Sequence, residues 1–170
     1  MNFKHFVREV PDFPEKGVVF KDITPLLEDP GAFQAAADAL LGFTAGLNID
    51  KVVGIESRGF FFAPLLASRL GAGFIPARKP GKLPREIRKQ EYDLEYGTDA
   101  LELHAESISE GDRVLVHDDV LATGGTARAM CDLIEQLGGE VVQCNFLIEL
   151  GFLKGREKLN GYSLRSLITY

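Results

Sequence analysis

The feature that most constrains this chain is residues 114–129, with the sequence VLVHDDVLATGGTARA. The stretch opens with an apolar run typical of a buried strand, and two adjacent carboxylates, Asp118 and Asp119, follow where that strand should end. A loop of small residues comes next, made of Ala122, Thr123, Gly124, Gly125 and Thr126. Apolar side chains then recur at helical spacing. The sequence therefore predicts a strand, an acidic pair, a glycine-rich loop and a helix, in that order.

This arrangement has a chemical reason. Glycines let a loop backbone approach an anion closely, and the following helix directs its unpaired N–H groups and positive dipole end at the loop. Thr123 and Thr126 add hydroxyl donors. The adjacent carboxylates would repel a phosphate, so they suit sugar hydroxyls, or a divalent metal that also binds the phosphates. An ordinary strand-to-helix turn with acids at the helix start is the alternative.

Two familiar phosphate motifs are excluded. No lysine follows the second glycine, as a Walker A loop requires, and the glycine spacing is not G-x-G-x-x-G. The formal net charge of -6 argues against a general nucleic-acid or membrane-surface binder, although a small basic pocket is compatible with it. At 170 residues the chain is expected to form one domain with a substantial core.

The two cysteines bear on the compartment. Cys131 and Cys144 lie in apolar-periodic stretches, which favours buried, reduced thiols in a cytoplasmic protein. The three histidines are scattered and do not have the spacing of a zinc site. The first ten residues lack the apolar segment of a signal peptide, and the longest apolar run, residues 59–67, is too short to span a bilayer.

Strands and helices alternate through the middle of the chain. Strands are expected at residues 51–55, 73–77, 112–118 and 141–150, with a helix at 60–70 between the first two. This order predicts βαβ units and a parallel sheet. Arg58 lies at a strand-to-helix turn, where α/β folds bind ligands, although an ordinary surface charge would fit there too.

The amino-terminal region is less regular. Apolar spacing over residues 3–10 predicts a short amphipathic helix that ends at Pro11. Phe20 follows in an extended stretch, where a lone aromatic is most often part of the core. Asp29 and Pro30 predict the start of a helix, with an acid as the cap and proline in the first turn.

The most basic stretch is residues 78–90, RKPGKLPREIRKQ, with six basic side chains against one acid. Its prolines and glycine predict a loop rather than a helix. A solvated, mobile loop is one interpretation, and a lid that closes over a polyanion is the other. Such local basicity in an acidic protein favours the lid. Two short strands, joined by a turn at residues 97–99, are expected over residues 92–104.

The segment DDVLATGGT resembles the motif that binds 5-phosphoribosyl 1-pyrophosphate (PRPP) in the type I phosphoribosyltransferases. Five more stretches resemble the adenine-specific members of that family, in the same order: PDFPEKGVVFKDITPLL, GIESRGFFFAPLLA, RKPGKLP, YDLEYGTDALELH and LKGREKL. The resemblance implies one α/β domain over residues 1–170, with a central, mostly parallel sheet flanked by helices. A small hood would come from residues 1–28 and 150–170, and a mobile loop-hairpin of about residues 79–97 would cover the site.

The resemblance also implies roles for the residues that contact PRPP. Asp118 and Asp119 would hold the ribose hydroxyls, and the loop of residues 122–126 would hold the 5′-phosphate. The pyrophosphate would be held by Ser57, Arg58, Arg78, Lys79 and Lys82. A non-proline cis peptide would join Glu56 to Ser57. Mg²⁺ would be held mainly by PRPP and water, with no direct protein ligand.

Other residues would contact the adenine base and transfer its proton. Phe20 and Leu150 would lie on the two faces of adenine, while backbone groups of Val19 and Lys21 would contact its edge. Glu95 would be the catalytic residue, as proton donor or acceptor beside the base. The implied reaction converts adenine and PRPP to AMP and pyrophosphate. The family further implies a cytoplasmic homodimer that has no nucleic-acid or membrane partner.

Two other functions stay open. A phosphoribosyltransferase for another purine is disfavoured by Ala122, since enzymes for 6-oxopurines usually carry an aspartate there, and by the LEYG stretch at residues 94–97. A PRPP-sensing regulator that binds nucleic acid or a protein would need a basic face or an added module, and this chain is too acidic and too short for either. Departures from the family pattern are His117, usually aliphatic, and Glu56, more usually aspartate.

Overall fold

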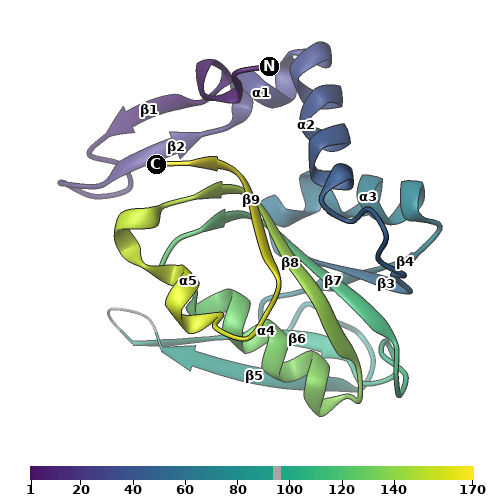
Figure 1. Ribbon diagram of the computed structural model, residues 1–170. Helices are drawn as coiled ribbons and strands as arrows, with labels where there is room; N and C mark the ends of the chain where they lie inside the picture. Colours follow the sequence, from purple (N-terminus) through teal and green to yellow (C-terminus); the bar gives the residue numbers. More distant parts are fainter. Residues whose placement is uncertain (94–96) are drawn as a thin grey trace. The chain divides into compact units, whose positions relative to one another are not determined.

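The computed structural model describes residues 1–93 and 97–170, which form two compact units, Met1–Ala39 and Leu40–Tyr170 (Figure 1). The first unit is built from short elements: η1 (Phe3–Phe6), β1 (Arg8–Pro11), β2 (Val19–Asp22), α1 (Thr24–Glu28) and most of α2 (Pro30–Gly42). The predicted start of α2 is confirmed, since the Asp29 carboxylate accepts a hydrogen bond of 2.7 Å from the Ala32 N–H.

The helix predicted over residues 3–10 is wrong. The chain makes one turn of 3₁₀ helix and then enters β1, which pairs antiparallel with β2 from Arg8 opposite Asp22 to Pro11 opposite Val19. Pairing with a strand that lies further along the chain decides this segment. Apolar spacing within the segment itself does not report such a contact.

The second unit is organised around a five-stranded parallel sheet with the order β4-β3-β7-β8-β9. The strands are β3 (Lys51–Ile55), β4 (Gly73–Ala77), β7 (Arg113–Leu121), β8 (Glu140–Glu149) and β9 (Leu164–Thr169). Helices α3 (Ala63–Leu70) and α4 (Gly125–Gln136) pack on β3–β4 and on β7–β8, respectively (Figure 1). The predicted βαβ order and parallel sheet are confirmed.

Three short helices and a hairpin complete this unit. The helices are η2 (Arg58–Phe61), η3 (Gly151–Leu153) and α5 (Gly155–Lys158). The hairpin pairs β5 (Ile87–Asp93) with β6 (Thr98–His104), so the end of the predicted basic loop is in fact a strand. Its inward residues pack against α4 and the sheet, and this contact makes residues 87–90 extended despite their charge.

The core lies between the sheet, α4 and the hairpin. Its buried apolar side chains include Val116, Phe146, Met130, Ile134 and Leu101. Cys131 and Cys144 are buried free thiols with their sulfur atoms 3.5 Å apart, as the apolar spacing predicted. Within residues 1–93 and 97–170, no helix combines the length and the hydropathy of a membrane span.

Candidate active site

The candidate site lies where the order of the sheet reverses. From β3 the chain crosses to β4 on one side, while β7, β8 and β9 follow one another on the other, so the switch falls between β3 and β7. Gly54 pairs with His117, which brings the residues after β3 beside the carboxyl end of β7. Open α/β sheets bind ligands at this position. The structure thus brings Arg58 beside the acidic pair that the sequence singled out.

The approach of the two strand ends depends on a glycine. A Cβ added to Gly59 would lie 3.0 Å from the His117 carbonyl oxygen and 3.1 Å from a carboxylate oxygen of Asp118. These distances are shorter than ordinary van der Waals contacts. The Glu56–Ser57 peptide that precedes this turn is cis, as the resemblance implied.

The acidic pair is largely withdrawn from solvent. Asp119 is 4% exposed, and its carboxylate forms an ion pair with the Arg58 Nε at 3.0 Å. Burial raises the pKa of Asp118 well above its ordinary value, and the neighbouring Asp119 charge raises it further. Burial also raises the pKa of Asp119, although Arg58 opposes this. The pair therefore favours neutral hydrogen-bond partners such as sugar hydroxyls over a second anion.

The glycine-rich loop encloses a small cavity at the start of α4. This cavity of about 70 Å³ is lined by Asp118, Val120, Leu121, Ala122, Thr123, Gly124, Thr126 and Ala127. Gly124 has φ +82° and directly precedes the helix, with no side-chain cap on the first turn. The first N–H groups of α4 have no partner within the helix and are available to a bound anion.

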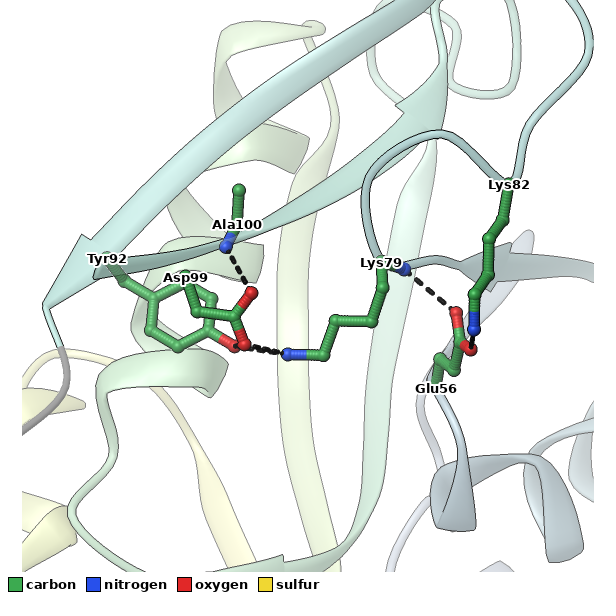
Figure 2. A network of polar contacts seen from close by, with 6 residues as sticks. All are labelled: Glu56, Lys79, Lys82, Tyr92, Asp99 and Ala100. Carbon is green, nitrogen blue, oxygen red and sulfur yellow. Dashed lines mark hydrogen bonds and ion pairs between the residues drawn. The ribbon is translucent and has the colours of Figure 1, made fainter. Parts of the chain in front are cut away.

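The predicted pyrophosphate residues gather around an acid that sequence reasoning did not assign to the site. Glu56 accepts a hydrogen bond from the Arg78 Nε at 2.9 Å. It also accepts from the Lys79 N–H at 2.8 Å and forms an ion pair with Lys82, as Figure 2 shows. Burial would raise the pKa of Glu56, but the bonds from Lys82, Lys79 and Arg78 outweigh it and lower that pKa to about 2. Glu56 is therefore ionised and holds three basic residues together. Ser57 is exposed beside it.

The side chain of Lys79 extends away from Glu56, toward Asp99 and Tyr92 of the hairpin (Figure 2). Its ammonium group forms an ion pair with Asp99 and donates a 2.9 Å hydrogen bond to the Tyr92 hydroxyl (Figure 2). Asp99 also accepts from the Ala100 N–H at 2.7 Å. Burial lowers the pKa of Lys79, but the bonds to Asp99 and Tyr92 reverse this and raise it. Lys79 thus joins the basic loop to the hairpin through residues that the sequence alone did not single out.

His117 lies beneath the acidic pair and is fully buried. Its Nδ1 is 2.7 Å from the Asn145 Oδ1 on β8, and its ring and that of Phe62 are arranged edge to face with the centroids 6.1 Å apart. Burial lowers the pKa of His117 to about 4, against the opposing effect of its hydrogen bonds with Asn145. The imidazole is therefore neutral at ordinary pH and belongs to the support of the site.

The residues predicted to hold a base lie on two elements. Val19, Phe20 and Lys21 lie on β2 in the first unit, where Phe20 contacts Phe13 edge-on at 5.1 Å. Leu150 follows β8 in the second unit and donates its N–H to the Leu121 carbonyl at 2.9 Å. Glu95, the predicted catalytic residue, lies outside the described residues. Among the residues that the structure does describe, no group of three or more His, Cys, Asp or Glu side chains is arranged to hold a metal ion.

The sheet carries an acidic pair and a glycine-rich loop at its switch point, which is the arrangement expected for binding a phosphorylated sugar. A family model described as the phosphoribosyl transferase domain matches residues 26–164. This chain therefore belongs to the phosphoribosyl transferase family. The chain is 62% identical to an adenine phosphoribosyltransferase of Christiangramia forsetii, over 100% of this chain and 99% of that relative. Within its class, the chain belongs to the adenine phosphoribosyltransferase family.

Further relatives and solved structures agree with this. The adenine phosphoribosyltransferase of Flavobacterium johnsoniae is 57% identical over the whole of both chains. The crystal structure of the enzyme from Thermoanaerobacter pseudethanolicus has a TM-score of 0.97 and 52% identity, over 99% of this chain and 98% of that chain. The enzyme from Saccharomyces cerevisiae, complexed with an imino-altritol bisphosphate and adenine, has a TM-score of 0.92 and 44% identity, over 97% of this chain and 96% of that chain.

Proposed function

We propose that this chain transfers the 5-phosphoribosyl group from PRPP to adenine, which yields AMP and pyrophosphate for purine salvage. The observation that carries the proposal is the juxtaposition of Arg58, the acidic pair and the 122–126 loop at one sheet edge. In the reaction, adenine N9 forms a bond to the anomeric carbon while the bond from that carbon to pyrophosphate breaks. The proton on adenine is lost, and the electron pair of the broken bond leaves with pyrophosphate.

The loop and the acidic pair hold the sugar phosphate. The first N–H groups of α4, with the hydroxyls of Thr123 and Thr126, donate to the 5′-phosphate. Asp118 and Asp119 accept from the ribose 2′- and 3′-hydroxyls, and Arg58 keeps Asp119 oriented. Positive charge develops on the sugar as the bond to pyrophosphate lengthens. Carboxylates beside the ring stabilise that charge electrostatically.

The basic side of the site stabilises the leaving group. Arg58, Arg78, Lys79 and Lys82, with Ser57, surround the pyrophosphate in this proposal. Arg78 and Lys82 are drawn together by Glu56 before any anion arrives, which reduces the reorganisation that binding requires. Closing of the predicted loop-hairpin excludes water, since water would compete with adenine for PRPP.

The residues that the resemblance assigns to the base are Val19, Phe20, Lys21 and Leu150. Backbone groups of Val19 and Lys21 read the edge of adenine, and Phe20 and Leu150 pack on its faces. Ala122 offers no carboxylate to a 6-oxopurine, which favours adenine. Glu95 accepts the proton that adenine loses as its N9 bonds to the sugar.

Magnesium fits the site as a partner of the substrate. Asp119 is already paired with Arg58, so its carboxylate is not a ready direct ligand for a cation. We therefore assign Mg²⁺ to the phosphate oxygens of PRPP and to water, where it would neutralise charge on the leaving group. The proposal also includes a single domain with its hood at residues 1–28 and 150–170, a cytoplasmic location and a homodimer, the last of these to be checked by light scattering.

The test is nucleotide formation from PRPP and Mg²⁺ with adenine, hypoxanthine, guanine and xanthine in parallel. We expect AMP from adenine and no product from the other bases. Product from an oxopurine would keep the PRPP site and contradict the role given to Ala122. If PRPP binds and no base reacts, a PRPP-sensing regulator becomes the better description.

The role of Glu95 is tested separately. Replacing it with alanine should lower kcat by about 10²-fold or more, because a positioned general acid or base contributes that much, and should leave PRPP affinity within about threefold. Single-turnover kinetics and equilibrium titration with PRPP measure the two effects. A variant with unchanged kcat would remove Glu95 from the mechanism.

A further inference from the structure

The 122–126 loop and α5 meet backbone to backbone. Gly155, the first residue of α5, is buried, and a Cβ added to it would collide with the Ala122 carbonyl oxygen and lie 3.0 Å from the Gly124 nitrogen. From the other side, a Cβ added to Gly124 would collide with the Gly155 carbonyl oxygen. The two glycines therefore interlock without room for a methyl group on either.

Residue 155 must be a glycine because the two backbones approach each other so closely. Its backbone is not among those with positive φ, so the conformation itself would admit any residue. Gly161, six residues further along, is the opposite case, because its φ is +99° and no atom lies within 4 Å of an added Cβ. One glycine is needed for what it touches, and the other for the shape of its own turn.

The segment that carries Gly155 has little freedom to retreat. Arg156 grips Glu149 with two hydrogen bonds, from Nε at 3.0 Å and from Nη2 at 2.6 Å. Ser166 donates to the same carboxylate at 2.7 Å, and Leu159 is buried. Arg156 thus ties α5 to β8, and Ser166 ties the same carboxylate to β9. A side chain at residue 155 would therefore displace the 122–126 loop, because α5 itself is fixed on its other side.

We propose that Gly155 is a positioning residue for the phosphate loop. It touches no substrate, and it acts by letting α5 support the backbone from Ala122 to Gly124, so that the N–H groups at the start of α4 converge on one point. The inference rests on the proposed function, since the ligand of the loop is the 5′-phosphate of PRPP. Arg156 contributes indirectly by holding α5 in place.

The first experiment compares Gly155→Ala with the matched control Gly161→Ala. Initial rates of AMP formation are measured over a range of PRPP concentrations at saturating adenine, together with thermal unfolding of each protein. Gly155→Ala should raise the KM for PRPP about tenfold, because the displaced loop would lose about one charge-assisted hydrogen bond to the phosphate. It should change kcat by less than about threefold. Gly161→Ala should lose thermal stability because of its φ, and keep the wild-type KM. Equal KM values in the two variants would overturn the proposal.

A second variant covers the case in which Gly155→Ala does not fold. Arg156→Lys keeps the charge and the glycine but loses the two-pronged grip on Glu149, so α5 should support the loop less firmly. We expect its KM for PRPP to rise about threefold, because the support that α5 gives to the loop is weakened but not lost. An unchanged KM would overturn the proposal. Failure of the unaltered protein to form AMP would count against the proposed function instead, which keeps the two questions apart.

Discussion

The loop of residues 122–126 and the cluster around Glu56 present anion-binding groups in different ways. The loop is held by its backbone, through the interlock of Gly124 with Gly155 and the hydrogen bond from Leu150 to Leu121. The cluster is held by side chains, which Glu56 and Asp99 collect through ion pairs. A backbone cradle keeps one geometry at any ionic strength. Charged side chains can exchange one carboxylate partner for another, so they suit a group that must be bound and later released.

Arg58→Ala should have the largest effect, since Arg58 is assigned to the pyrophosphate and also pairs with Asp119 of the acidic pair. The variant loses a cation from the pyrophosphate side and leaves the buried Asp119 without its ion pair. We expect kcat/KM for PRPP to fall about 10²- to 10³-fold. Arg58→Lys should recover part of this loss, because it restores the charge without the planar group. A loss smaller than about tenfold in Arg58→Ala would contradict this double role.

Asp119→Asn should come next. The change removes the charge that would accept from a ribose hydroxyl, so PRPP should bind about tenfold more weakly in a calorimetric titration. Asp132→Asn on the exposed face of α4 is the matched control and should bind PRPP normally. An unchanged affinity in Asp119→Asn would contradict the ribose role and leave the loop alone responsible for the sugar phosphate.

Paired changes compare the two regions directly. Lys82→Ala should weaken the inhibition of the reaction by pyrophosphate about fivefold, and the loss should shrink at high salt because the Lys82 side chain is 47% exposed. Thr123→Ala should raise the KM for PRPP only about twofold, since backbone N–H groups carry most of the binding in the loop. If Thr123→Ala has a larger effect than Lys82→Ala, the proposed difference between a backbone loop and a side-chain cluster is wrong.

His117 should affect stability rather than binding. Its pKa is about 4 in the folded protein against 6.5 in the unfolded chain, so the unfolded state binds more protons between these values. The contribution of His117 to stability is therefore complete above about pH 6.5 and declines as the pH falls toward 4, by about 2 kcal/mol at pH 5. Urea unfolding at pH 7 and 5 measures this. His117→Gln should show a smaller difference between the two pH values and an unchanged KM for PRPP at pH 7.5.

The sequence predicted those parts whose cause is local. Residues 114–129 show a strand by their apolar run, a loop by their glycines and a helix by its period, and the structure has all three. The pairing of β1 with β2 and the start of β5 at Ile87 escaped prediction, because distant partners decide both. Glu56 and Gly155 escaped for the same reason. Glu56 collects basic partners, and Gly155 has no room for a side chain, only because of neighbours that are remote in the sequence.

The place of His117 beside Asp118 on β7 has one more consequence. Successive side chains of a strand face opposite sides, so a single residue inserted or deleted between Arg113 and His117 would exchange every side chain of the strand end. Asp118 would exchange faces with its neighbours His117 and Asp119, and Asp119 would lose its ion pair with Arg58. The length of β7 up to its acidic pair therefore decides which face each of these side chains takes, and no residue can be added or removed there without changing the site.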